Sequence, residues 1–395
     1  MEARVSLYNG KMPHMADQLI VCDVTMRDGE QAPFVMFSLE EKKGLARKLD
    51  QMGIQQIQLA MAGTSEQFIE EAKELCALGL HAKTELMTRG FHVDWRKDID
   101  SAIYCGSDII HSFLPASRYV RGIHAGMSDD EIKKRSTEII EYIRKKSDQE
   151  INISLMDATR TEETLLLELV HVIEKSGAHR IRLADSVGVA TPEAFYELVS
   201  KVREAAPNII LGVHCHNDFG LAFANVLAAI KAGATLIDVS VNGLGERCGN
   251  AALSEVVVGL SALYGFDTGI DLSLMKELSE YVEKISGVYI PENKPLVGKF
   301  AFSDTLDLHI VAQQNDDFAL QGIFPEDIGN KREIVLGKYT GPAAVVAKAK
   351  NLGIHVDEKY HGVIASQLRK IATQDKQRRI GDEDFLNVVH SCVSA

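Results

Sequence analysis

Short apolar runs alternate with longer amphipathic segments along the first two-thirds of the chain. The runs lie at residues 19–24, 54–60, 81–87, 108–114, 151–156, 180–185, 209–216 and 235–241. Their length predicts strands, and the longer segments between them have helical spacing. Strands that alternate with helices in this way indicate a parallel sheet with right-handed crossovers.

The ends of two long segments support this interpretation. SLEEKKGLARKLDQMG (38–53) and TEETLLLELVHVIEKSGA (161–178) both end at glycine or Gly-Ala, which is typical of a helix C-terminus. Ser38 precedes acidic residues in the first turn, as an N-cap does. We therefore expect helices between the strands.

Eight strands within about 250 residues predict an α/β fold of the (β/α)₈ TIM-barrel type. A doubly wound open sheet is the alternative, but it usually has fewer strands, and no GxGxxG turn follows the first run. We expect a lead-in at 1–17, the barrel at 18–270 and a helix with a Pro/Gly-rich linker at 271–295. A smaller, α-rich C-terminal subdomain is predicted at 296–395.

Composition narrows the class of function. The chain has 395 residues, 46% of them hydrophobic, and a net charge of −13, which gives no electrostatic support for binding to nucleic acid or an anionic membrane. We find no apolar run of about 18 residues and no secretory h-region, so we expect a cytoplasmic protein without a membrane span. The six cysteines have no CxxC spacing and are expected to be reduced thiols.

The stretch VHCHND at 213–218 carries the first candidate chemistry. Because strand side chains alternate between faces, His214 and His216 point the same way and Cys215 points the other way. Two imidazoles at the C-terminal end of a strand can chelate a metal ion. The alternative is a pair of hydrogen-bonded polar residues at the barrel mouth.

Two further side chains favour the metal site. Asp28 lies just beyond the first strand, and Asn250 ends the glycine-rich loop NGLGERCGN at 242–250 after the last strand. Barrel closure brings the first strand beside the eighth and near the seventh, and active sites form from these loops. Asp28, His214, His216 and Asn250 could thus hold a divalent ion, Mg²⁺ or Mn²⁺ with Zn²⁺ possible in principle.

Three motifs then resemble a known family. RDGEQ at 27–31, HCHNDFGLAFAN at 214–225 and NGLGERCGNAALSEVV at 242–257 are similar to the 2-isopropylmalate synthase and homocitrate synthase group. IVLGKYTG at 334–341 is similar to the small C-terminal subdomain of that group. The resemblance therefore covers nearly the whole chain, and it implies metal-dependent carbon–carbon bond chemistry beside an acyl-CoA.

The resemblance assigns roles to matching positions. Arg27 is expected to contact the 2-oxo acid and to stabilise the developing alkoxide, unless it only forms a surface salt bridge with Glu30 or Asp23. Asp23, Glu30 and Gln31 are expected to orient Arg27 and Asp28. Ser186 matches a threonine beside the substrate carboxylate, although Asp185 and Ser186 could instead cap the next helix.

The implied reaction is a Claisen-type condensation of acetyl-CoA, as co-substrate, with a 2-oxo acid. The general base would be His309, which matches a histidine of the family's C-terminal subdomain, with Tyr339 as a second candidate nearby. A hydrogen-bonded interface histidine is the alternative role for His309. The resemblance also implies a homodimer with exchanged tail modules.

The chain departs from the family pattern at several positions. QLAMAG replaces the usual Glu-Ala-Gly-Phe-Pro, Met156 replaces a glutamate, and DTLDLH keeps only His309, with Asp304 at the first histidine. Four apolar residues are expected to line the substrate pocket: Leu59, Met61, Phe113 and Met156. The alternative is that these four side chains only fill the barrel core. An apolar, branched or aromatic 2-oxo acid is therefore favoured; a dicarboxylate would use Arg89 or Arg118.

Two other functions stay open. A hydroxyacyl-CoA lyase would run the reverse cleavage and use a mobile cysteine such as Cys248, but the long tail with His309 favours synthesis. A catalytically inactive barrel is the second, and the intact metal-ligand set argues against it. The chain ends at Ala395 without the feedback domain of leucine-pathway members, so we expect no feedback inhibition by that route.

Overall fold

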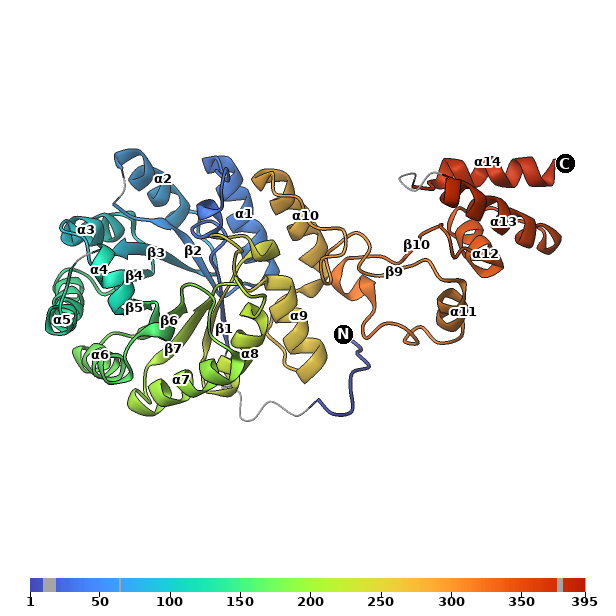
Figure 1. Ribbon diagram of the computed structural model, residues 1–395. Coiled ribbons are helices and arrows are strands. Elements are labelled where there is room, and N and C mark those ends of the chain that lie inside the picture. Colours follow the sequence, from blue (N-terminus) through green and yellow to red (C-terminus); the bar gives the residue numbers. More distant parts are fainter. Residues whose placement is uncertain (10–18, 64, 125, 375–378, 395) are drawn as a thin grey trace. The chain divides into compact units, whose positions relative to one another are not determined.

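Eight parallel strands close into a barrel, as the alternating pattern predicts (Figure 1). The computed structural model describes residues 1–9, 19–63, 65–124, 126–374 and 379–394. The strands are β1 (Ile20–Asp23), β2 (Gln56–Met61), β3 (Lys83–Arg89), β4 (Ile109–Pro115), β5 (Glu150–Met156), β6 (Arg180–Asp185), β7 (Ile210–Cys215) and β8 (Leu236–Val239). The pairing of β1 with β8, Cys22 opposite Asp238, closes the barrel. The predicted (β/α)₈ fold is confirmed.

Helices surround the strands (Figure 1). They are α1 (Leu39–Met52), α2 (Glu66–Cys76), α3 (Trp95–Cys105), α4 (Arg118–His124), α5 (Asp129–Lys146), α6 (Glu163–Ser176), α7 (Pro192–Ala205), α8 (Ala222–Lys231), α9 (Leu253–Tyr264) and α10 (Met275–Ser286). Short 3₁₀ turns lie at η1 (Gly29–Gln31), η2 (Ala158–Arg160), η3 (Val241–Gly243) and η4 (Leu272–Leu274).

Local chemistry explains where the helices begin and end. Ser38 and Glu41 form a reciprocal capping box at the start of α1, and Gly53 ends that helix with a φ of 91°. Gly177 ends α6 in the same left-handed conformation, with a φ of 92°. Glycine adopts this conformation without the steric cost of a Cβ atom. Both helix ends lie where the sequence predicts them.

The chain divides into two compact units, Gly10–Tyr289 and a second that joins Met1–Asn9 with Ile290–Ala395. In the second unit Arg4 N donates to Gly322 O (2.9 Å), so the described part of the lead-in is anchored there. Residues 10–17 of the predicted lead-in lie outside the described residues. The predicted linker at 271–295 contains η4 and α10, and α10 contacts α1 in the barrel unit.

The second unit contains a small helical core. Its elements are β9 (Ser303–Asp304), α11 (Asp307–Asn315), η5 (Pro325–Ile328), β10 (Glu333–Ile334), α12 (Pro342–Asn351), α13 (Glu358–Gln374) and α14 (Asp382–Val393). Ile310, Ala344, Ile364 and Phe385 belong to one buried apolar cluster that joins the helices. The predicted α-rich C-terminal module is thus confirmed as a module of this kind.

All six cysteines are free thiols, as their spacing predicts. Among the described residues, the helices include none that is long and apolar enough to cross a membrane.

Candidate metal centre and active site

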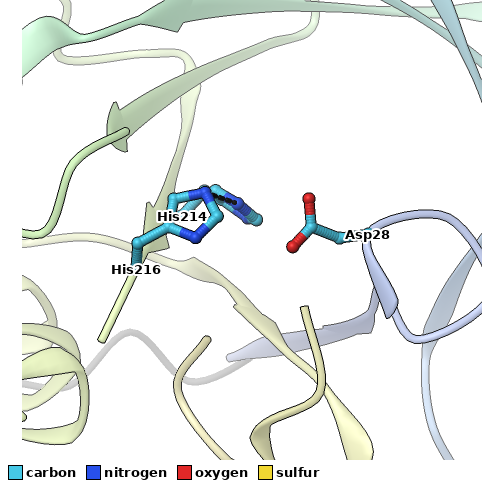
Figure 2. Close-up of side chains that lie close together, drawn as sticks. All are labelled: Asp28, His214 and His216. Atoms are coloured by element: carbon cyan, nitrogen blue, oxygen red, sulfur yellow. Dashed lines mark hydrogen bonds between the residues drawn. The ribbon is translucent and has the colours of Figure 1, made fainter. Parts of the chain in front are cut away.

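Three buried side chains that are far apart in the sequence converge at the C-terminal end of the barrel. Asp28 comes from the loop after β1, His214 lies near the end of β7, and His216 directly follows that strand. One ligand atom from each lies within 4.8 Å of the others. Figure 2 shows the Asp28 carboxylate facing the two imidazoles. The sequence-based expectation that these residues meet therefore agrees with the geometry.

The local backbone explains how each side chain reaches this point. After β1 the chain turns back, and Asp28 N donates to Val24 O (2.7 Å), which leads into η1. In β7 the side chains alternate, so His214 and His216 share a face while Cys215 is buried on the other. Both imidazoles are therefore held by a strand end rather than by a long loop.

Hydrogen bonds fix the orientation of both rings. His214 Nδ1 lies 2.9 Å from Asp238 Oδ2, and His216 Nδ1 lies 3.3 Å from Gly249 O. A carboxylate and a carbonyl oxygen only accept, so each Nδ1 must carry the proton. The two Nε2 atoms then face each other as lone pairs 3.3 Å apart. A cation between them would satisfy both lone pairs.

The loop after β8 completes this arrangement. Asn250 Nδ2 donates to Asp28 Oδ2 (2.6 Å), while Asn250 Oδ1 is buried without a hydrogen-bond partner among the described residues. A Cβ atom at Gly245 would lie 2.6 Å from Asp28 Oδ2, and one at Gly249 would lie 1.8 Å from Gly243 O. Gly245 therefore lets the backbone approach the Asp28 carboxylate closely, and Gly249 lets the loop pack against its own backbone.

The protonation states also suit a metal ion. Burial alone would raise the pKa of Asp28, but the Arg27 guanidinium and the hydrogen bond from Asn250 hold it below its usual range. Burial, together with His214, lowers the pKa of His216 to about 3. Metal ligands must be deprotonated, so the Asp28 carboxylate and the His216 imidazole are already in the binding form at neutral pH.

The donor set fits a divalent cation. It offers two imidazole nitrogens, a carboxylate and the unpartnered Asn250 Oδ1, which suits a transition metal or Mg²⁺ with positions left for substrate. Asp28, His214, His216 and Asn250 could hold such an ion.

Arg27 lies directly beside this centre. It is 9% exposed, its Nη1 donates to Asp28 Oδ1, and its Nε donates to Gln58 Oε1. It therefore does not form the surface salt bridge with Glu30 or Asp23 that we weighed as an alternative. Glu30 instead pairs with Lys42 (2.7 Å), and Asp23 accepts from the backbone and hydroxyl of Thr25. Glu30 and Asp23, two of the three residues expected to orient Arg27 and Asp28, are thus engaged elsewhere, and Gln58 holds Arg27 instead.

The other residues expected near the substrate do not all lie at the barrel mouth. A cavity of about 200 Å³ is lined by Arg27, Glu30, Gln31 and Met61 together with residues of α2. Leu59 is completely buried, within the wall. Phe113 packs edge-on against Phe91 with ring centroids 5.3 Å apart. The structure thus brings Met61 close to Arg27 but places Leu59 in the core.

The loops after β5 and β6 are tied together. Ser186 Oγ accepts from Asp157 N (2.8 Å), close to the half-buried Met156. Asp185 accepts from Val189 N and Ala190 N, both at 3.2 Å, whereas α7 is capped by Thr191. Asp185 therefore shapes the loop, and the hydroxyl proton of Ser186 is not used in its bond to Asp157.

His309 and Tyr339 both lie in the second unit. His309 Nδ1 lies 3.3 Å from Asp304 Oδ1, and Tyr339 is exposed. The position that carries aspartate instead of the family's histidine therefore contacts the retained histidine directly.

Sequence reasoning missed a group of charged residues inside the barrel. Asp238, Arg182 and Glu85 are each at most 1% exposed and are linked by ion pairs. Their signal was available, because charged residues stand in the middle of the apolar runs RIRLAD and TLIDVSV. Such positions face a barrel interior only if they are paired there.

Both the barrel and the C-terminal part of the chain match models of known protein families. Residues 18–282 match the HMGL-like family model, and residues 296–376 match the model "Homocitrate synthase post-HMGL domain-like". The chain belongs to the HMGL-like family. The family to which the sequence motifs point is thereby confirmed.

Relatives of this HMGL-like chain include several named synthases. Homocitrate synthase AksA of Methanopyrus kandleri is 37% identical over 96% of this chain and 94% of its own length. The putative (R)-citramalate synthase CimA of the same organism is 38% identical over 93% and 71%, and 2-isopropylmalate synthase of Methanocaldococcus jannaschii is 38% identical over 96% and 73%. A solved HMG-CoA lyase from Acinetobacter baumannii, in complex with coenzyme A and 3-methylmalate, matches with a TM-score of 0.61 and 25% identity, covering 71% of this chain and 95% of the lyase.

Proposed function

We propose that this HMGL-like enzyme condenses acetyl-CoA with a 2-oxo acid, giving a 2-substituted malate and free CoA. The observation that carries the proposal is the convergence of Asp28, His214 and His216 beside Arg27 at the barrel mouth. A carboxylate, two imidazoles and a guanidinium suit activation of a carbonyl that becomes an alkoxide. An inactive binding barrel would have no need to keep these four groups buried together.

The reaction balances as follows. A base removes a proton from the acetyl methyl group, and the resulting carbon forms a bond to C2 of the oxo acid. The oxo group takes up a proton and becomes a hydroxyl group. Water then cleaves the thioester C–S bond, which leaves a carboxylate and the CoA thiol.

The chain's own residues divide this work. Asp28, His214, His216 and Asn250 would hold the divalent ion, which when bound supplies Lewis acidity at the oxo group. Arg27 offers a guanidinium beside the ligand carboxylate, where it can stabilise negative oxygen. Ser186 can donate its hydroxyl proton to the substrate carboxylate from the rim of β6.

Chain coverage favours synthesis over the reverse cleavage. The HMG-CoA lyase structure corresponds to 71% of this chain, whereas homocitrate synthase AksA corresponds to 96% of it. The part beyond a lyase-length chain is the second unit, which contains His309. The match of that unit to a homocitrate synthase domain supports the same direction.

The general base is proposed to be His309. Asp304 contacts its Nδ1, so Nε2 is the ring nitrogen left to accept a proton. The base can act only where the second unit meets a barrel mouth, either of its own chain or of the second copy in a homodimer. Tyr339, from the same unit, is the second candidate.

Mixing two inactive variants separates these arrangements. Co-refolded or co-expressed His214→Ala and His309→Ala chains should regain activity if tails are exchanged, because one barrel then has both intact groups. If each tail serves its own barrel, the mixed dimer stays inactive. Activity of His309→Ala alone at the wild-type level would remove His309 from the mechanism.

The charges near the mouth favour an apolar 2-oxo acid. Arg89, one of the two arginines that a dicarboxylate could use, is held by Asp98 through Nε (2.7 Å) and Nη2 (2.9 Å). Arg118 is exposed and lies over the Tyr119 ring. Phe113 lies near the C-terminal end of β4 and Met156 ends β5, so both strands carry apolar side chains there. We therefore expect a branched or aromatic side chain on the substrate.

The test is a panel of 2-oxo acids with acetyl-CoA and Mn²⁺ or Mg²⁺, monitored by release of free thiol. Branched or aromatic acids should give a higher kcat/KM than pyruvate or a 2-oxo dicarboxylate. Met156→Glu should lower kcat/KM for the apolar acids by about tenfold or more, since a buried charge near the tail costs binding. An unchanged ranking in that variant would refute the pocket assignment.

A homocitrate synthase-type reaction with a 2-oxo dicarboxylate is the second candidate. It is favoured by the end-to-end match to homocitrate synthase AksA. Highest kcat/KM for the dicarboxylate in the same panel would establish it, and Arg89 or Arg118 would then be the partner of the second carboxylate.

A further inference from the structure

A chain of buried charges runs beneath the candidate metal centre and ends on one of its ligands. Glu85 Oε1 accepts from Arg182 Nη1 (2.8 Å), and Arg182 Nη1 lies 3.3 Å from Asp238 Oδ2. Asp238 Oδ2 in turn lies 2.9 Å from His214 Nδ1. The three charged side chains come from β3, β6 and β8, so the connection crosses the barrel interior.

Burying charged side chains costs free energy, so a series of buried charges calls for a functional explanation. Barrel interiors are usually filled by branched apolar side chains. Here Arg182 is among the largest completely buried side chains, and Glu85 is ionised because Arg182 and His111 outweigh the effect of burial and lower its pKa. Replacing buried ion pairs by apolar residues is often neutral or stabilising. Fold stability alone therefore does not explain this chain of charges.

The series of buried charges ends at Asp238, and the contact of Asp238 with His214 suggests what the series does. Because Asp238 can only accept, it fixes the His214 proton on Nδ1 and leaves the Nε2 lone pair pointing toward Asp28 and His216. His216 has a weaker restraint, a neutral carbonyl at 3.3 Å. A carboxylate behind a ligand histidine also makes the ligand nitrogen more basic.

We propose that Asp238 is a positioning residue that presets His214 for metal binding, and that Arg182, anchored by Glu85, holds the Asp238 carboxylate in place. The proposal deepens the proposed function and rests on its metal centre. Asp238 does not touch substrate or reacting atoms in this scheme; it acts only through His214.

The direct test is metal affinity measured without substrate. Purified metal-free protein is titrated with Mn²⁺, and free Mn²⁺ is followed by its electron paramagnetic resonance signal. Asp238→Asn keeps the shape but removes the charge, and we expect the Kd for Mn²⁺ to rise about 10- to 100-fold. Thermal unfolding of the metal-free variant reports whether it is folded.

The matched control is Asp23→Asn. Asp23 is also a completely buried carboxylate of the barrel, but its partner is Thr25 rather than a ligand histidine. We expect its Kd for Mn²⁺ to equal that of the wild type. An equal loss of affinity in both variants would mean a general effect of replacing a buried acid by its amide and would overturn the specific role of Asp238.

A spectroscopic measurement on the wild-type chain does not depend on whether Asp238→Asn folds. Long-range ¹H–¹⁵N correlation on metal-free protein with ¹⁵N-labelled histidine reports which ring nitrogen carries the proton. The His214 signal, identified by its loss in His214→Gln, should be that of the Nδ1–H tautomer. An Nε2–H tautomer would overturn the proposal even if Asp238→Asn does not fold.

The outcomes also distinguish the proposal from the function on which it rests. Tight Mn²⁺ binding by the wild type and an unchanged Kd in Asp238→Asn would overturn the positioning role alone. A wild-type chain that binds no Mn²⁺ would overturn the metal centre and this role with it.

Discussion

The two units of the chain differ in whether charged side chains are buried beside the apolar ones. The barrel encloses Glu85, Arg182 and Asp238, whereas the second unit closes around an apolar cluster that includes Ile310, Ile364 and Phe385. Desolvating charge costs free energy that apolar burial does not. We infer that the buried charges of the barrel serve the proposed chemistry at its mouth, while the apolar core of the second unit holds its helices together.

The largest expected difference between the two units is in Mn²⁺ binding after one histidine of each is replaced. His214→Ala should lose Mn²⁺ binding and reduce thiol release to background while the far-UV circular dichroism stays that of the wild type. His361→Ala, which loses a hydrogen bond to Val356 O (2.9 Å) in the second unit, should bind Mn²⁺ as the wild type does. Normal turnover in His214→Ala would contradict the assignment of the metal centre.

Within the barrel, Glu85→Gln should destabilise the fold. It leaves the buried Arg182 charge without its main partner, and breaking a buried pair costs about 3–5 kcal/mol. The free energy of unfolding can be measured with guanidinium chloride. We also expect weaker Mn²⁺ binding, because Arg182 would no longer be anchored near Asp238. A stable variant with unchanged affinity would contradict the link between the charge chain and the metal centre.

The corresponding change in the second unit is Phe385→Ala. Phe385 is completely buried in the apolar cluster, and its truncation should cost about 3–5 kcal/mol through lost contacts and a cavity. Mn²⁺ affinity of the native protein should remain unchanged, in contrast to Glu85→Gln. A large rise in the Kd for Mn²⁺ would show that the two cores are energetically coupled.

The smallest expected effect concerns pH. Burial raises the pKa of Asp23 to about 7, whereas the unfolded carboxyl group titrates near its ordinary value of about 3.9. The folded state therefore binds more protons between these values, and its stability falls as the pH rises through this window. We expect a loss of about 2 kcal/mol between about pH 5 and pH 7, measured by denaturant unfolding. Asp23→Asn should have a flatter profile, and an identical profile would refute the raised pKa.

Much of the fold could be predicted because its signals are local. All eight apolar runs became strands of the barrel, and Ser38 and Gly53 mark the ends of α1. The convergence of Asp28 with His214 and His216 followed from barrel closure once the strands were in order. The resemblance to the synthase group supplied the chemistry, and the family comparison agrees with it.

The sequence by itself determined the (β/α)₈ order and the face on which His214 and His216 lie, because strand periodicity and barrel closure depend only on residue order. Only the tertiary structure decided that Gln58 holds Arg27 and that Asp238 holds His214. These pairs join residues 31 and 24 positions apart, and no local pattern encodes which side chains of different strands and loops will meet. The physical reason is that a buried polar group takes its partner from whatever lies within about 3 Å, and that neighbourhood exists only after the barrel has closed.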